Sequence, residues 1–91
     1  MNRDQRAIEI LRDYIRKDII KRSIIPEEAE KNIPEYDVYV VWKCKVLQNA
    51  KYLLCTNLPD MMYYEITYNG DKKEWYLDAY NKVENVVYKE E

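Results

Sequence analysis

The residues best suited to catalysis in this chain are two cysteines, Cys44 and Cys55, and no histidine accompanies them. A thiol becomes a strong nucleophile when a nearby base or cation removes its proton, and imidazole is the most common base. Cys44 is expected on the core face of a strand, so we interpret both cysteines as buried structural thiols. A cross-strand disulfide between them fits the register expected below but is disfavoured in a reducing compartment.

Carboxylates and lysines form two weaker chemical patterns. Asp60, Glu65 and Thr67 faintly resemble the pattern of magnesium-dependent nucleases, which has a lysine where Thr67 stands. Tyr68 and Lys72 have the spacing of a tyrosine–lysine dehydrogenase pair, but that chemistry needs one helix and these two residues flank a turn. Two cysteines without histidine cannot complete a zinc site, and one glycine cannot form a glycine-rich phosphate loop. We therefore expect Asp60 in a turn, Glu65 on a wet strand, and neither enzymatic activity, metal nor cofactor.

The elements that would position a functional surface begin with a helix. Apolar residues at spacings of three and four predict an amphipathic helix over residues 3–22: Ile8, Leu11, Ile15 and Ile19. Asn2 and Gln5 have the spacing of a capping box before it. Residues 23–36, with two prolines, are expected to be a connector that contains a short helical turn beginning at Pro26.

Charge divides unevenly along the chain, whose net charge is −2. Residues 1–22 hold seven basic and four acidic side chains, including all five arginines, whereas the remainder holds eight basic and thirteen acidic ones. A basic amphipathic helix can bind nucleic acid or an acidic partner. It can equally lie on its own acidic sheet, and the excess of positive charge is small beside that of a DNA-binding domain. We favour the second interpretation.

A period of two begins at Asp37 and predicts strands. In the first strand one face would carry Val38, Val40, Trp42, Cys44 and Val46, and the other Tyr39, Val41, Lys43, Lys45 and Leu47. A two-residue turn at Asn49-Ala50 places Val46 opposite Leu53 and Cys44 opposite Cys55, which keeps one face apolar. A four-residue loop at 69–72 pairs Ile66 with Trp75 and is preferred to a tight Asn-Gly hairpin, because the hairpin pairs Glu65 with Glu74. "VENVVYK" is expected to add a last, shorter strand.

The predicted fold class is α+β. An N-terminal amphipathic helix packs on one face of a four-stranded antiparallel meander, with the sheet over residues 37–89 of a single domain spanning 1–91. Neither a signal peptide nor a membrane span is apparent, so we expect a cytoplasmic protein with no membrane partner.

A single helix covers one face of a sheet and leaves the second face without cover. The expected registers place a tyrosine-rich candidate interaction face there: Tyr39, Val41, Lys43, Lys45, Tyr52, Leu54, Tyr63, Tyr76 and Tyr80. Tyrosine is common at interfaces because it joins a large apolar ring to a polar tip. We expect this face to bind another protein or to form a homodimer. Alternatives are a plain solvated sheet, since tyrosine is a good strand former, and a nucleic-acid module that uses the basic helix and the strand lysines.

Two stretches, "DVYVVWKCKVLQNAKYLL" and "PDMMYYEITYNGDKKEWYLDAYNKVEN", resemble a family of small proteins of about this length. That family is encoded by phages and prophages of Gram-positive bacteria and is a domain of unknown function. The resemblance covers Asp37 to Asn85, and the family pattern often has glycine after the Pro-Asp pair, where this chain has Met61. It implies a phage accessory protein made in the host cytoplasm and transfers no activity, ligand or catalytic residue.

Overall fold

A computed structural model describes residues 2–90, which begin with a capped helix, α1 (Arg3–Arg22). The Asn2 side chain accepts a hydrogen bond of 2.8 Å from the Gln5 amide, and the Gln5 side chain accepts one of 3.1 Å from the Asn2 amide. This reciprocal pair satisfies two of the amides that a helix leaves free at its start. The predicted bounds of the helix and its capping box are confirmed.

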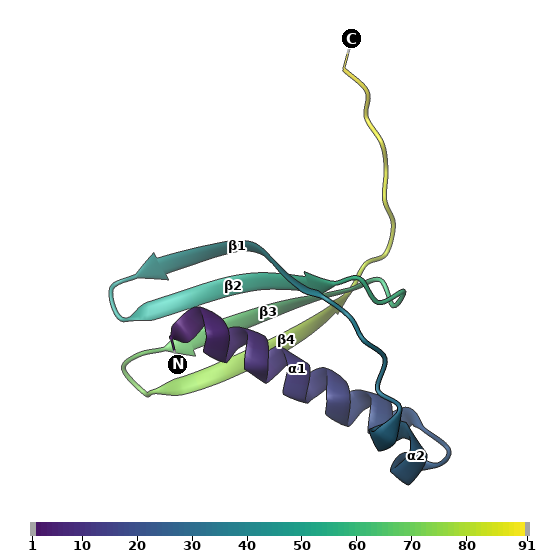
Figure 1. Cartoon of the computed structure of the whole chain (residues 1–91). Coiled ribbons are helices and arrows are strands. Elements are labelled where there is room, and N and C mark those ends of the chain that lie inside the picture. The colour runs from purple at the N-terminus through teal and green to yellow at the C-terminus, as the bar shows by residue number, and fades with distance from the viewer. Residues whose placement is uncertain (1, 91) are drawn as a thin grey trace.

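Helix α1 covers one face of the sheet (Figure 1). Its residues Ala7, Leu11 and Ile15 are buried, at the i, i+4 spacing that keeps side chains on one side of a helix. They meet five buried sheet residues: Ala50, Tyr52, Leu54, Tyr64 and Ile66. The ring of Tyr14 adds an edge contact to Tyr64, with centroids 5.9 Å apart. The core of the domain is therefore one layer between helix and sheet.

The connector contains a second, short helix, α2 (Pro26–Lys31), with proline at its start as predicted. No side chain of α2 is buried, and the ion pair of Arg16 with Glu30 ties it to α1. Ile24, between the two helices, is 97% exposed. An isoleucine in such a connector is expected to pack under the core, and for Ile24 this expectation is wrong.

The sheet is an antiparallel meander in the order β1-β2-β3-β4. Its strands are β1 (Val38–Val46), β2 (Asn49–Thr56), β3 (Met62–Asn69) and β4 (Glu74–Asn81). This confirms the predicted α+β class with one helix on a four-stranded sheet. The expected last strand "VENVVYK" is wrong, because residues 82–90 form no strand and leave the sheet as an extended tail (Figure 1). Its weak alternation gives it no apolar face to lay on the core.

The predicted β1–β2 register is wrong. The turn lies at Leu47-Gln48 instead of Asn49-Ala50, with Leu47 in the left-handed region at φ 56°. Val41 is an extra residue in β1, so that a bulge interrupts the ladder between Val40 and Trp42. A bulge shifts every later side chain of a strand to the opposite face.

The bulge explains the misplaced faces of β1. Before it, Val40 lies opposite the buried Leu54, as the alternation predicts. After it, Lys43 lies opposite the buried Tyr52, and the helix side of β1 carries the lysines. The side chains predicted for the core, Trp42, Cys44 and Val46, therefore lie on the face without a helix. Their exposure agrees, at 44% for Trp42 and 59% for Val46.

The β3–β4 hairpin keeps the predicted faces in a different register. Its loop has four residues, as expected, but spans 70–73, so Ile66 lies opposite Leu77 instead of Trp75. A shift of two residues preserves alternation, and Tyr64, Ile66, Trp75 and Leu77 still face α1. Gly70 does not adopt a positive φ. A Cβ there would lie 2.7 Å from the Gln48 Cβ, so glycine is required by the close approach of the two hairpin turns.

Met61 lies in the left-handed region, at φ 56°, in the link from β2 to β3. This is the position at which the family pattern described above often has glycine. Glycine reaches that conformation at no steric cost, whereas methionine does not. The preceding turn is closed by Asp60, whose carboxylate accepts a 3.1 Å hydrogen bond from the Met62 amide, as expected of a turn residue.

Candidate protein-binding face

The pairing of the strands sorts every side chain of the sheet onto one of two faces, since residues opposite each other share a face. Tyr52 and Leu54 are buried beneath α1 and define the covered face. We call the other one the open face. It carries Tyr39, Trp42, Cys44, Val46, Asn49, Lys51, Leu53, Cys55, Tyr63, Glu65, Thr67, Asn69, Glu74, Tyr76, Asp78 and Tyr80.

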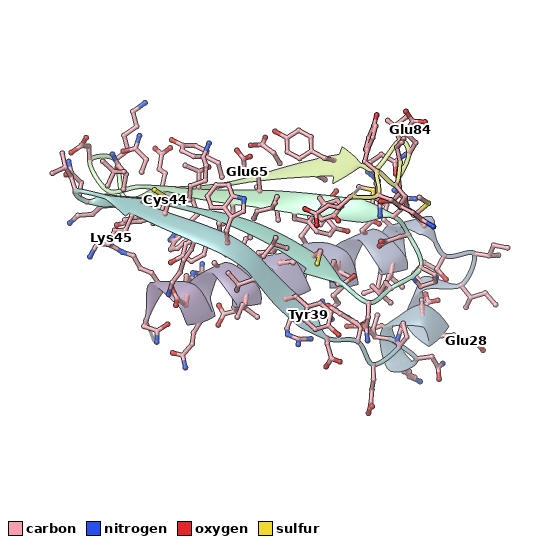
Figure 2. All side chains as sticks on the ribbon, turned by 90° about the horizontal axis from the view of Figure 1, so that it is seen from above. Glu28, Tyr39, Cys44, Lys45, Glu65 and Glu84 are labelled. Atoms are coloured by element: carbon pink, nitrogen blue, oxygen red, sulfur yellow. The ribbon has the colours of Figure 1, made fainter. Side chains whose placement is uncertain are left out.

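The half of the open face formed by β1 and β2 is mainly apolar. Trp42 lies opposite Leu53, and Val46 is among the most exposed apolar side chains of the sheet. A shallow hollow of about 330 Å³ lies here, lined by Trp42, Cys44, Val46, Asn49, Ala50, Lys51 and Thr67. Figure 2, which looks down on the sheet, shows Cys44 on the upper side of β1, away from α1 below. An exposed tryptophan beside a hollow is a typical anchor at a protein interface.

The half formed by β3 and β4 joins tyrosines to acids. Glu65 and Asp78 lie opposite each other, and Tyr76 donates a 2.7 Å hydrogen bond to Glu74, which raises the pKa of Tyr76. Lys51 forms a 2.9 Å ion pair with Glu65, and this bonded partner raises the pKa of Lys51. The three carboxylates of this half outnumber the two nearby lysines, Lys51 and Lys82, whose Nζ lies 6.0 Å from the centre of the Tyr63 ring, and the open face is acidic on this side.

The structure divides the nine residues of the predicted interaction face. Tyr39, Tyr63, Tyr76 and Tyr80 lie on the open face. Val41 is the bulge residue and is half exposed. The other four, Lys43, Lys45, Tyr52 and Leu54, lie on the covered face, where Tyr52 and Leu54 belong to the core. Their prediction is wrong because the sequence interpretation left out the bulge: it placed Trp42 and Cys44 on the core face with Val40. Strand β2, which pairs with this part of β1, was assigned the wrong faces with it.

Sequence reasoning missed Trp42 and Leu53 as residues of the open face. Both were assigned to the core by hydrophobicity alone. A usable signal was the pair Lys43 and Lys45: lysines seldom face a core unless an acid receives them, and Asp4 in the first helical turn is such an acid. Tyrosine at 52 also has a hydroxyl that needs a partner when its ring is buried.

That polar network holds the start of α1 to the sheet. The Tyr52 hydroxyl donates a 2.8 Å hydrogen bond to Oδ1 of Asp4, and Lys43 Nζ lies 2.5 Å from Oδ2. The bonds from Lys43 and Tyr52 lower the pKa of Asp4. Burial, with the bond to Asp4, raises the pKa of Tyr52 to about 12. The Arg3 guanidinium lies 4.3 Å from the centre of the Tyr68 ring, which contacts Trp75 at 4.8 Å.

A cleft of about 550 Å³ opens beside this network. Three cations line it, Arg3, Lys43 and Lys45, with Asp4 and Tyr52. Because Asp4 neutralises Lys43, two positive charges remain for a ligand. Figure 2 shows Lys45 near the end of β1, directed toward the helix side. The β1 bulge therefore brings the strand lysines next to the basic N-terminus of α1. The sequence interpretation placed these lysines on the sheet face opposite the helix.

Four of the remaining cations of α1 pair with acids of α1 or α2. Arg6 pairs with Glu9, Arg16 with Glu30, Lys17 with Asp13, and Arg22 with Asp18. The Arg12 guanidinium stacks 5.0 Å from the centre of the Tyr36 ring. Paired cations lose much of their attraction for phosphate, so the helix surface does not form a continuous basic stripe.

The cysteines and the two weak chemical patterns do not assemble into a site. Both thiols are free; Cys44 is exposed and lies opposite Lys51, whereas Cys55 lies opposite Tyr39. The predictions that they are buried and face each other are therefore wrong, for the register reason given above. Glu65 is held by Lys51, and Tyr68 lies under Arg3 on the covered face. Among the described residues, no group of three or more acids, cysteines or histidines could hold a metal ion.

Comparisons with known proteins place the chain in a family without assigning it a role. Neither curated proteins nor solved structures give a significant match. The helices within residues 2–90 are too short or too polar to cross a bilayer. The model of a family of unknown function, DUF6275, matches residues 4–90. The match includes α1, the whole sheet and most of the tail, and the chain belongs to this family of unknown function.

Proposed function

We propose that this is a non-enzymatic binding protein that acts by contact of the open face with a protein. One observation carries the proposal: Trp42, Leu53 and Val46 lie together on a sheet face that no helix within residues 2–90 covers (Figure 1). Tyr39, Tyr63, Tyr76 and Tyr80 lie on the same face as this apolar area. Aromatic residues with apolar neighbours and a polar rim are the composition of interface centres.

Affinity capture with matched variants tests this proposal. The tagged chain is compared with Trp42→Lys and with Ile24→Lys, which adds the same charge at an exposed residue far from the sheet. Because Trp42 is partly exposed and outside the core, both variants should keep the circular dichroism spectrum of the wild type. If the open face binds the partner protein, Trp42→Lys should abolish capture of that partner and Ile24→Lys should preserve it. Equal capture by all three chains contradicts the proposal.

The resemblance described above supports a setting for this activity: a phage or prophage accessory protein acting in the cytoplasm of a Gram-positive host. Its partner would then be a host or phage protein, or a second copy of itself. Quantitative mass spectrometry of a lysogen before and after prophage induction tests this. The protein should rise together with phage proteins and fractionate with the cytoplasm; constant abundance contradicts a phage origin.

Nucleic-acid binding is the second candidate, and the basic cleft is the observation that favours it. Arg3 and Lys45 are available there, whereas the acids of the open face argue against a stacking platform on the sheet. Titration with labelled single- and double-stranded oligonucleotides at low salt decides the matter. Binding should weaken steeply with salt and be reduced by Lys45→Gln but not by Lys21→Gln on α1. Absence of binding at low salt removes this candidate.

A further inference from the structure

We propose that the occupant of the open face is the open face of a second copy, so that the chain forms a homodimer of two stacked sheets with a helix on each outer side. This inference rests on the function proposed above and gives its partner. In this arrangement a two-fold axis runs across the strands, and each strand lies over its own counterpart. Two antiparallel sheets that pack face to face in this way form a sandwich.

The size of the open face is close to what a dimer needs. Strands of eight or nine residues are about 26–30 Å long, and four of them span about 15–19 Å, a flat area on the order of 500 Å². Side chains raise the accessible area above the flat one, so two such faces bury roughly 1,200 Å² in all, the lower limit of specific interfaces. Further contacts would place the dimer within the ordinary range.

The tail supplies these contacts. It departs from β4 where the Lys82 amide donates a 2.7 Å hydrogen bond to the Met61 carbonyl, and it rises on the open side of the sheet (Figure 1). Val83 is 92% exposed and Tyr88 89%, with Val86 and Val87 also exposed. Nine extended residues reach about 30 Å, enough to follow the edge of a sheet stacked on the open face. Apolar side chains in such a position gain cover only from a second molecule.

The distribution of side chains selects the direction of the axis. An axis along the strands would put β1 over β4 of the second copy, with Trp42 over Asp78 and Val46 over Glu74. An axis across the strands keeps the apolar half over the apolar half. With the axis midway between the Trp42 and Cys44 levels, Asp78 meets Tyr76 of the second copy, so carboxylates face hydroxyls instead of each other.

The same axis brings the tail next to the loop between β3 and β4 of the second copy. The tail leaves the sheet at the Tyr80 end of β4, and the axis brings the opposite end of the second copy's β4 over that place. The loop there carries Lys72 and Lys73, which would lie beside Glu84 of the tail. Glu84 and these two lysines thus have opposite charges where the arrangement brings them together.

Light scattering after gel filtration, from micromolar to millimolar protein, tests the dimer. The wild type should shift from the mass of one chain to that of two. Trp42→Glu should raise the dissociation constant about 30-fold or more, as for an interface anchor. A chain ending at Lys82 should dimerise more weakly and keep the circular dichroism of the sheet, whereas Ile24→Lys should dimerise like the wild type. A wild type that stays monomeric at every concentration overturns the inference.

Cross-linking of the natural cysteines tests the direction of the two-fold axis. With the axis across the strands, the two copies of Cys44 lie close to the axis and to each other, whereas the two copies of Cys55 lie far apart. A short bis-maleimide should therefore cross-link Cys55→Ser, which retains Cys44, but not Cys44→Ser, which retains Cys55. With the axis along the strands the two Cys44 residues are at opposite edges, and a dimer that Cys55→Ser cannot cross-link overturns the arrangement. A monomeric chain that still captures a protein through Trp42 refutes the dimer alone. If Trp42→Lys changes neither capture nor mass, the proposed function fails as well.

Discussion

The hydroxyl of Tyr52 donates a 2.8 Å hydrogen bond to Oδ1 of Asp4 and thereby joins the centre of the sheet to the first turn of α1. The bond explains why a tyrosine occupies a core position, since its ring is buried and its hydroxyl finds an acceptor at the edge. Asp4 also lies near the positive end of the helix dipole. One carboxylate therefore stabilises the helix, receives Lys43 and orients the sheet.

Tyr52→Phe removes this bond and retains the ring. We expect a loss of about 1 kcal/mol in the free energy of unfolding, less than for a buried charged bond because Asp4 is partly exposed. The pKa of Asp4 is lowered by folding, so its contribution is complete above its ordinary value of 3.8 and is lost as the pH falls below it. Urea unfolding at pH 7 and pH 3 should therefore show a larger difference between wild type and Tyr52→Phe at pH 7. A difference that is the same at both values contradicts this role of Asp4.

Two tyrosines should resist ionisation. Burial raises the pKa of Tyr52 and of Tyr64 to about 12, and the Asp4 bond adds to the effect at Tyr52. A pKa raised by folding gives stability that is complete below about pH 10 and is lost as the pH rises toward 12. Absorbance at 295 nm should show a late phase in the folded protein that Tyr64→Phe reduces. Its absence, with all tyrosines ionising together below pH 11 in the folded state, contradicts this prediction.

Leu53 and Leu54 are adjacent in sequence and lie on opposite faces of β2. Leu54 has no exposed surface, so Leu54→Ala should cost roughly 2–5 kcal/mol of stability. Leu53 is half-buried on the open face, and Leu53→Ala should cost the monomer about 1 kcal/mol or less. Thermal unfolding at low concentration, where association is minimal, compares the two. If Leu53→Ala cost more stability than Leu54→Ala, Leu53 would lie in the core, as the sequence interpretation placed it.

Gly70→Ala should destabilise the protein by about 1–3 kcal/mol, because the new methyl group collides with Gln48 of the neighbouring turn. The collision would also disturb the 2.9 Å hydrogen bond from the Gly70 amide to the Asn49 side chain. Lys72→Ala, in the same exposed loop, is the matched control and should be nearly neutral. Denaturant midpoints measure both, and equal midpoints would show that the turns do not approach each other closely.

Met61→Gly should stabilise the protein. Relief of the left-handed conformation contributes about 1–2 kcal/mol, and the greater freedom of glycine in the unfolded chain offsets about half of that. The net gain of about 0.5–1 kcal/mol corresponds to a rise of a few degrees in Tm for a domain of this size. Lys72→Gly, at a loop residue without a positive φ, should instead lower Tm slightly. A lower Tm for Met61→Gly would show that the Met61 side chain makes a necessary contact.

The helix and the general architecture follow from local signals in the sequence. Asn2 and Gln5 cap α1 because, at this spacing, each side chain accepts a hydrogen bond from the backbone amide of the other. Leu11 lies between Ala7 and Ile15 in an apolar stripe whose spacing is specific to a helix. Ile66 and Trp75 were placed on the covered face despite an error in register, since a shift of two residues keeps every side chain on its side.

The candidate site was less predictable because it depends on non-local geometry. Val41 becomes a bulge through its surroundings in the sheet. The segment "VYVVWKCKVL" has two alternations that could lie beneath α1: the more apolar one ends in Trp42, Cys44 and Val46, and the other contains Lys43 and Lys45. The choice between them is made elsewhere, by Asp4 receiving Lys43 and Tyr52. Hydrophobicity alone therefore assigned Trp42 to the core, and only the pairing of strands shows it on the open face.

The bulge at Val41 makes the charge of two surfaces depend on the pairing of one residue. If Val41 entered the ladder as an ordinary strand residue, Trp42, Cys44 and Val46 would lie beneath α1, and Lys43 and Lys45 would point outward, beside Lys51. A chain without Val41 would instead keep the present faces, because Val40 and Trp42 already lie opposite the adjacent residues Leu54 and Leu53. With the bulge removed and Val41 retained, the open face would become cationic and attract phosphate, while the basic cleft would lose its lysines. The pairing of a single residue, without any change of side-chain type, is thus enough to move a relative of this protein between an apolar binding surface and an anion-binding one.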